Sequence, residues 1–445
     1  PTPFVNAFSN PTLGSLRYNT SQAGSPVPIS YGTQRVPINL LEFWNFQGKG
    51  NGGGSGGKGL GSGGGKKGAN QQYSVDVAFG LCQGPVAFTG SAYADSHGNN
   101  RIWANGGITN GLGNAGLNGY AGNDGQAPDP VFASSDVNQP VISYSGTCYV
   151  TGTPLNLGSS SALPDISFEI SGFLQGTGGP SFPDDARPDL ILADMLTNPR
   201  YGAGFPAVNL DTAGALADWG TYCQAAQIAM SPLLDKQQPA ARWIEEIAEL
   251  SVSAVLWSGT RLKLIPYGDQ PLAANGASWS PNLTWQYSLG DGDFLPWSGG
   301  GSSGAGGTDP VLLTRSDPAQ ATNWLSVEYL DAGNSYNPQL IAVFDQGAID
   351  LYGLRTEPPI QAHEFTNPTS ATVAAQLLLQ RRLYLRNTYK FKLGWRYALL
   401  EPMDIVLITD ATLGLTAAPV RITQIEEDDN GELTISAEEI PGVTP

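Results

Sequence analysis

Cysteine, histidine and charge are all scarce in this sequence. Its 445 residues include three Cys and two His, and charged residues make up 14%, against about 25% in ordinary soluble domains. Three cysteines without a CxxC pair exclude a zinc knuckle or a disulfide framework built from them alone. Two histidines leave few options for a His-based metal site or a Ser/His triad. The cysteine usage is typical of a chain made in a reducing cytosol.

Long apolar runs are also missing. No stretch approaches the roughly 18 consecutive apolar residues of a membrane-spanning helix. The N-terminal Pro1-Thr2-Pro3 does not open a basic region followed by an apolar one, as a secretory signal would. We therefore expect neither stable membrane insertion nor secretion through such a signal.

Positively charged residues are fewer than negatively charged ones. Asp and Glu number 39 against 22 Lys and Arg, a net charge of −17. Such a surface repels phosphate backbones, so we expect no specific nucleic-acid binding.

Glycine, proline and aromatic residues are abundant instead. The chain has 57 Gly, 33 Pro, 10 Trp, 17 Tyr and 15 Phe, and 40% of it is hydrophobic. Single domains rarely grow past about 250 to 300 residues, so the length implies several domains. Short alternating runs separated by turns predict a β-rich α+β protein with two tube-like β-barrel domains linked by an α+β segment.

Composition shifts divide the chain into four parts. Residues 1–13 are polar and Pro-rich and are interpreted as an N-terminal arm lying on another chain. Residues 14–182 are interpreted as the first barrel domain, with a Gly/Ser/Lys-rich flexible loop at 47–68 and an Asn/Gly-rich insertion at 96–140. Residues 183–275 are interpreted as the α+β domain. Residues 276–445 are interpreted as the second barrel domain, with a long helix at 370–387.

Helical periodicity is clearest in the α+β part. Three helices are predicted there, over residues 189–196, 211–226 and 240–251. Three carboxylates fall on the last of them, Glu245, Glu246 and Glu249, at a spacing that also describes a solvated helix face.

Enzyme signatures are weak. The Gly-rich run ending in Lys58 continues with Gly59 where a P-loop needs Ser or Thr. The GxSxG pattern of residues 300–304 has only Gly and Ser on both sides, without the strand and helix of a nucleophile elbow. His97 is interpreted as a turn residue and His363 as a surface or interface group. We expect no catalytic residue, no cofactor and no metal site.

One motif is specific. Residues 189–204, DLILADMLTNPRYGAG, resemble the helix-to-loop motif D-hydrophobic-L-T-N/H-P-R-Y-G-x-G of the central tail hub, or tip attachment, proteins of long-tailed bacteriophages and gene transfer agents. Its centre is Asn198, Pro199, Arg200, Tyr201 and Gly202. Pro199 is expected to end the preceding helix and Gly202 to take a positive φ. Two interpretations stay open: Arg200 and Tyr201 pack within the chain, or they contact a partner.

The order of further motifs matches the same family. The segments YSVDVA at 73–78, CQGPV at 82–86 and LWSGTRL at 256–262 are similar to its strand, turn and hairpin motifs. The segment EPMDIV at 401–406 resembles its P-G-D barrel turn, with Met403 in place of Gly.

The resemblance implies a non-enzymatic structural protein of the virion tail tip, made in the host cytoplasm. It implies a homotrimeric baseplate hub that closes the distal tail tube, bridges sixfold and threefold components, and opens for DNA ejection during host entry. Implied partners are a distal tail protein or tube-adaptor ring, the tape measure protein, and tail fibre or receptor-binding proteins; DNA passes through its channel. The alternative is a tail-associated glycan-binding or cell-wall-degrading protein, with Trp103 and Tyr120 as walls of a sugar cleft.

Overall fold

The protein is β-rich with few helices and divides into two compact units. The computed structural model describes residues 26–50, 71–131, 142–297 and 309–441. Unit 1 comprises Pro1–Gln175 and Ser231–Gln237, and unit 2 comprises Gly176–Met230 and Gln238–Pro445. Within the described ranges, no helix has the length and apolarity needed to cross a membrane. The predicted arm at 1–13 lies outside the described residues.

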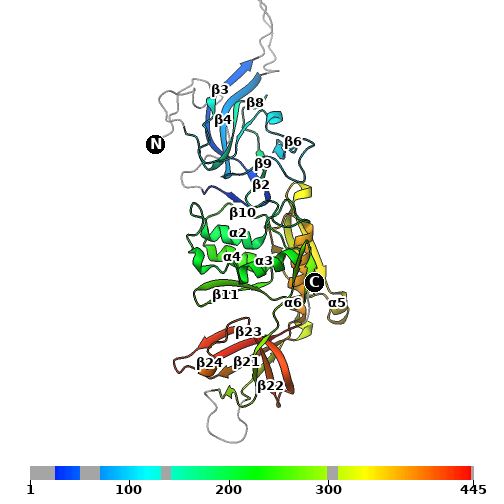
Figure 1. Ribbon diagram of the computed structural model, residues 1–445. Helices are drawn as coiled ribbons and strands as arrows, with labels where there is room; N and C mark the ends of the chain where they lie inside the picture. Colours follow the sequence, from blue (N-terminus) through cyan, green and yellow to red (C-terminus); the bar gives the residue numbers. More distant parts are fainter. Residues whose placement is uncertain (1–25, 51–70, 132–141, 298–308, 442–445) are drawn as a thin grey trace, which may run out of the picture. The chain divides into compact units, whose positions relative to one another are not determined.

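Unit 1 consists of two four-stranded antiparallel sheets and one small strand pair (Figure 1). The first sheet has the order β2 (Thr33–Pro37), β9 (Ile166–Ser171), β5 (Arg101–Ala104), β6 (Gly107–Asn110). The second has the order β3 (Asn39–Gly50), β4 (Gln71–Gln83), β8 (Thr147–Gly158), β7 (Asn118–Tyr120). In addition, β1 (Ile29–Ser30) pairs with β10 (Leu233–Leu234).

Both sheets contribute to one apolar core. Val36 and Phe168 come from the first sheet, and Val77, Phe79 and Val150 from the second; all five are fully buried. Alternation along each strand places one set of side chains in this core. The same alternation in the sequence is the pattern that predicts a β-rich structure for this part of the chain.

The predicted start of the Gly-rich loop is corrected by the structure. The loop predicted at 47–68 does not begin at Gln47, because Gln47 pairs with Ser74 and Gly48 with Tyr73 in β3 and β4. Ladder hydrogen bonds use the backbone, so a Gly-rich strand end can pair although its composition resembles a linker. The rest of that predicted loop, residues 51–68, lies outside the described residues.

The segment 96–140 is more than an insertion. It supplies β5, β6 and β7, which belong to the two main sheets. Its Asn and Gly residues form the turns between these strands, for example Asn105 and Gly106, both with positive φ. Turn residues dominate the composition of such short hairpins and hide the strands between them.

Unit 2 begins with three helices and a hairpin. They are α2 (Pro188–Thr197), α3 (Ala215–Ala225), α4 (Ala240–Leu250) and the pair β11 (Ser253–Ser258) and β12 (Arg261–Pro266). Trp219 of α3 is fully buried, and its indole nitrogen donates to Ser253 Oγ at 2.9 Å. Helix α4 starts and ends close to the predicted bounds, 240–251, whereas α3 starts four residues later than the predicted residue 211. A short pair, β13 (Leu272–Ala274) and β14 (Ala277–Trp279), follows the hairpin.

A three-stranded sheet covered by a helix lies further along unit 2. Its order is β19 (Asn337–Phe344), β18 (Trp324–Asp331), β20 (Ile360–Gln361). The short helix α5 (Gln346–Tyr352) follows β19, and α6 (Pro368–Tyr384) packs on β18 and β19. The long helix predicted at 370–387 is α6; it starts at Pro368 after Asn367, whose side chain accepts from the Thr369 N–H.

The C-terminal part of unit 2 is a seven-stranded half-barrel sheet. It runs β15 (Trp285–Leu289), β22 (Ile405–Asp410), β23 (Leu415–Glu427), β24 (Leu433–Glu439), β21 (Asn387–Leu393), β16 (Phe294–Leu295), and β17 (Leu312–Arg315) also pairs with β21. The end strands β15 and β16 do not pair with each other in the described chain. A closed tube requires that pairing.

Met403 keeps the turn conformation that glycine would favour. The residue has a φ of 76° and is 9% exposed. Its N–H donates to the Ile422 carbonyl at 2.7 Å, and Asp404 accepts from the Glu401 N–H at 2.8 Å. These hydrogen bonds and the burial of the Met side chain offset the cost, about 1–2 kcal/mol, of a left-handed residue with a Cβ.

Candidate interaction site at the Asn198 corner

The predicted motif forms a sharp corner at the end of α2. Asn198 is extended, with φ −60° and ψ 126°, and its N–H closes the helix by donating to the Asp194 carbonyl. A residue before proline avoids the helical region because the proline ring crowds it. The chain therefore leaves the helix at Asn198.

Asp194 holds this corner with both carboxylate oxygens. Asn198 Nδ2 donates to Asp194 Oδ1 at 2.9 Å, and the Tyr201 hydroxyl donates to Asp194 Oδ2 at 2.6 Å. Hydrogen bonds to a charged acceptor are stronger than neutral ones. Only Asp194 lies in α2; Asn198 and Tyr201 follow the helix, and their side chains reach back to its last turn.

Gly202 serves the corner in a different way from the one predicted. Its φ is not positive; the positive φ falls on Gly204, at 71°. A Cβ at Gly202 would lie 2.5 Å from the Asn198 carbonyl oxygen and 2.6 Å from the Asn198 nitrogen. Glycine is needed there because the backbone folds back onto Asn198, whose carbonyl accepts from the Gly202 N–H at 2.9 Å.

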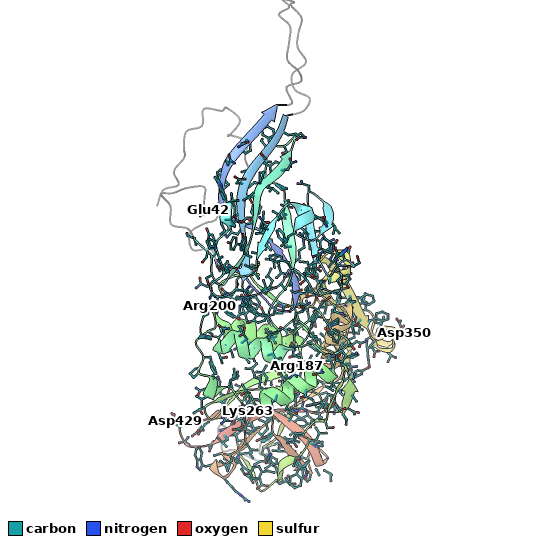
Figure 2. All side chains as sticks on the ribbon, turned by 45° about the horizontal axis from the view of Figure 1, so that its top comes forward. Glu42, Arg187, Arg200, Lys263, Asp350 and Asp429 are labelled. Atoms are coloured by element: carbon teal, nitrogen blue, oxygen red, sulfur yellow. The ribbon has the colours of Figure 1, made fainter. Side chains whose placement is uncertain are left out.

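Arg200 and Pro199 lie at the surface of the corner. Both are exposed, and Figure 2 labels Arg200. The Arg200 backbone N–H donates to Asn198 Oδ1 at 3.0 Å. The backbone of Arg200 is thus fixed, while its side chain is on the solvent side of the corner.

Apolar side chains adjoin the corner. The Phe205 N–H donates to the Leu196 carbonyl, and the Phe205 ring contacts the Trp257 ring with centroids 5.8 Å apart. Trp257 is 57% exposed and Val208 is 74% exposed. We call Pro199, Arg200, Phe205, Val208 and Trp257 the corner surface. It combines one exposed cation with three large apolar groups, a composition common in protein interfaces.

The hairpin that carries Trp257 is tied to the segment after the corner. Leu210 bridges to Leu262, and Arg261 Nη1 lies 2.9 Å from Asp211 Oδ1. The Ala215 N–H and the Arg261 guanidinium both lower the pKa of Asp211, the N–H being the larger cause. Asp211 stays ionised at neutral pH and fixes the start of α3 to β12.

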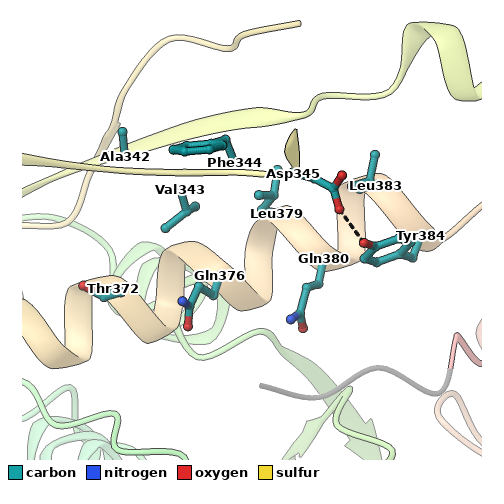
Figure 3. Close-up of a pocket in the computed structure, with 10 residues that line it drawn as sticks. All are labelled: Ala342, Val343, Phe344, Asp345, Thr372, Gln376, Leu379, Gln380, Leu383 and Tyr384. Atoms are coloured by element: carbon teal, nitrogen blue, oxygen red, sulfur yellow. Dashed lines mark hydrogen bonds between the residues drawn. The ribbon is translucent and has the colours of Figure 1, made fainter. Parts of the chain in front are cut away.

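A groove lies between β19 and α6 (Figure 3). Its volume is about 610 Å³, and it is lined by Ala342, Val343, Phe344, Asp345, Thr372, Gln376, Leu379, Gln380, Leu383 and Tyr384. Asp345 accepts from the Tyr384 hydroxyl at 2.7 Å and from the Ala348 N–H at 2.8 Å. These two hydrogen bonds lower the pKa of Asp345, so its carboxylate serves the cap of α5 rather than proton transfer.

The other residues considered for chemistry lie apart. His97 is exposed in a turn, and His363 Nε2 lies 2.9 Å from Glu328 Oε1. Glu245 and Glu249 are exposed on α4, and Glu246 pairs with Arg242. Among the residues that the structure describes, no three His, Cys, Asp or Glu side chains come together as a metal site would need. The P-loop-like run and the GxSxG pattern lie outside them.

The two aromatic residues proposed as walls of a sugar cleft both pack against neighbours. Trp103 is 6% exposed, and the Arg35 guanidinium lies over its ring at 4.6 Å. Tyr120 stacks on Tyr149 with centroids 4.4 Å apart and donates its hydroxyl to Asp129. The Trp103 side chain is therefore buried, and one face of the Tyr120 ring is covered by Tyr149.

The chain is similar to phage tail proteins in two comparisons. Residues 239–425 match a family described as "Putative phage tail protein". A chain in the structure "Virion of native gene transfer agent (GTA) particle" is similar over 95% of this chain and 86% of that chain, with 16% identity and a TM-score of 0.60. A search of curated proteins finds no match.

Two prophage proteins are also similar, at lower scores. The 43 kDa tail protein of prophage MuSo2 from Shewanella oneidensis has 13% identity and a TM-score of 0.33, over 83% of this chain and 90% of that chain. The prophage tail protein gp18 from Listeria monocytogenes EGD-e has 11% identity and a TM-score of 0.30, over 82% and 84%. These scores are too low to carry a fold argument. The chain thus shares its fold with a gene-transfer-agent virion chain, and its residues 239–425 match the model of a phage tail family.

Proposed function

We propose that the chain is a non-enzymatic structural protein of a phage-type tail and that it forms the central hub at the tail tip. The observation that carries this proposal is the fold shared with a virion chain over 95% of the sequence, together with the family match at residues 239–425. The motif centred on Asn198–Gly202 resembles that of tail hub proteins, and for this reason we propose the hub rather than another position in the tail.

The hub closes the distal end of the tail tube as a homotrimer. Three copies can meet a sixfold ring only if each chain offers two similar β-rich surfaces. The segments proposed for these surfaces are residues 14–182 and 276–440, each forming a tube-like barrel in the assembly, with residues 183–275 between them and residues 1–13 reaching a neighbouring chain. A distal tail protein or tube-adaptor ring, the tape measure protein and tail fibre or receptor-binding proteins are the proposed neighbours.

The hub opens for DNA ejection. With a net charge of −17 per chain, a trimer has a strongly acidic surface, and an acidic channel repels DNA phosphates. The genome would then pass without binding to the wall.

The mass of the purified full chain, measured by light scattering, tests the oligomer. We expect three copies, and cryo-electron microscopy of tails should place this trimer at the distal end. A hexamer, a stable monomer at high concentration, or density along the tail shaft would overturn the hub assignment. A trimer at the tip with a basic channel would overturn the charge argument alone.

A further inference from the structure

Two cysteines face each other inside unit 1. Cys82 on β4 and Cys148 on β8 are directly paired in the antiparallel register, between the pairs Gly80↔Tyr149 and Gln83↔Thr147. Directly opposed residues of an antiparallel pair project to the same side of the sheet, with Cβ atoms about 4.5–5.5 Å apart. Disulfides require Cα atoms about 4.4–6.8 Å apart, a range that includes both kinds of antiparallel pair.

The two thiols are in contact and reduced. Both cysteines are free and have no exposed surface, and their thiol groups form a hydrogen bond with each other. Burial raises the pKa of the Cys148 thiol well above its ordinary value, so this thiol is neutral and slow to react while the sheet stays closed.

We propose that Cys82 and Cys148 are a modification site that forms a cross-strand disulfide when the chain meets a small disulfide oxidant. One thiol loses its proton and attacks a sulfur of the oxidant, which releases one small thiol and leaves a mixed disulfide. The second cysteine then loses its proton and attacks the protein sulfur of that mixed disulfide, which releases the second small thiol. The protein loses two protons and two electrons, and the oxidant gains them as its disulfide becomes two thiols.

The bond would close the part of unit 1 that contains β5, β6 and β7. These strands all lie between Cys82 and Cys148 in the sequence. Closing a long loop in the unfolded chain favours the folded state. A virion protein is made in a reducing cytosol and then enters surroundings that preserve disulfides, but the pairing itself stands on the strand register and is independent of the proposed function.

Cys223 provides an internal control. It is buried in α3, in unit 2, beside Asp189. Asp189 and Arg187 are the charged groups that act on its thiol, and neither can form a disulfide. Oxidation of the folded chain should leave this thiol free.

The experiment compares reduced full-length protein with protein incubated in glutathione disulfide at about pH 8. Free thiols are alkylated after denaturation, and peptides are mapped by mass spectrometry. We expect one alkylated cysteine, Cys223, and a linked peptide pair containing Cys82 and Cys148. The melting temperature should rise by about 5–15 °C and return after dithiothreitol.

Two variants sharpen the result. Cys223→Ser should keep the thermal shift, and Cys148→Ser should lose it. The proposal is overturned if the oxidised, folded protein retains three alkylated thiols, if a glutathione adduct persists on Cys82 or Cys148, or if the links join different chains. If Cys148→Ser fails to fold, the comparison of oxidised with reduced wild-type protein still tests the proposed disulfide, because it needs no variant.

Discussion

Asp194 holds the corner although it lies outside the motif centre Asn198–Gly202. Its carboxylate accepts from Asn198 and from Tyr201, so a side chain of the last turn of α2 holds two residues that follow the helix and fixes the exit of the chain. The sequence places Asp194 within the matched motif, and only the spacing to positions 198 and 201 signals this role. Tyr201 is thus hydrogen-bonded within the chain, and Arg200 is exposed at the surface.

Removing the Tyr201 hydroxyl should destabilise the protein more than removing the Arg200 side chain. Tyr201→Phe deletes one hydrogen bond to a charged acceptor, and we expect the free energy of unfolding to fall by about 1–2 kcal/mol. Arg200→Ala changes an exposed side chain, and we expect a change within about 0.5 kcal/mol. Urea unfolding followed by tryptophan fluorescence measures both. A larger loss for Arg200→Ala would mean that its guanidinium is a structural group.

Glu364 is a half-buried carboxyl group whose ionisation opposes folding. Burial is the main cause that raises its pKa to about 7; Glu246 adds to the shift, and His363 opposes it. Because the ordinary pKa of the group is 4.5, the folded state binds more protons than the unfolded state between these two values. The contribution of Glu364 to stability therefore falls as the pH rises through this window.

The neutral variant Glu364→Gln should remove this pH dependence. At about pH 8 we expect the variant to be more stable than wild type by about 1–2 kcal/mol, and at about pH 4 to be no more stable. Thermal melts at both pH values measure the difference, with Glu245→Gln on the exposed side of α4 as the control. Equal effects at the two pH values would show that packing, not charge, decides the outcome.

At the scale of elements, the strands β3 and β4 define where the Gly-rich loop begins. The pairing of Gly50 with Gln71 brings its two ends together. Replacing residues 52–69 by a two-residue Asn-Gly turn should leave the melting temperature within about 2 °C, because loop length enters stability only logarithmically. Differential scanning calorimetry checks this, and a matched Asn-Gly-Gly-Gly turn controls for turn geometry. A failure to fold would assign those residues a structural role.

Local patterns predict the elements better than their pairing. Apolar spacing predicts α2, α4 and α6 to within a few residues of their observed ends. It misplaces the start of α3 because the Asp211 carboxylate accepts from the Ala215 N–H and Gly214 is not helical, with φ −111° and ψ −109°. Whether strands close into a tube depends on which strands pair across long distances, and alternation within one strand does not record its partner.

The corner surface shows the same limit. Pro199 and Arg200 belong to a contiguous motif, and the sequence marks them. Phe205 meets Trp257 through a contact between segments about 50 residues apart, and no local pattern joins them. The sequence feature that could have indicated this surface is Trp257 itself, a large aromatic residue at an outward position of a hairpin strand.

At the scale of the whole molecule, the corner surface is the part we expect to meet a neighbouring protein. Val208→Asp places a charge on an exposed apolar position, and Val208→Thr keeps the shape as a matched control. Both should melt within about 1 °C of wild type, because an exposed side chain contributes little to stability. In a tail-assembly assay, we expect the Asp variant to lower particle yield at least tenfold and the Thr variant to leave it unchanged.

An equal yield for Val208→Asp and wild type would remove Val208 from the interface. An equal fall for both variants would indicate a loss of folding in the cell, which the melts of the purified proteins would reveal.

The pairing of β1 with β10 has a consequence for biosynthesis. Ile29 pairs with Leu234, so the first strand of unit 1 waits for a partner that the ribosome adds about 200 residues later. At 5–20 residues per second this delay is roughly 10–40 s. By then the residues of α2 and α3, which belong to unit 2, have been synthesised, so unit 1 is not complete before part of unit 2 has been made, and a nascent chain stalled before Leu233 would leave Ile29 and Ser30 without their strand partner.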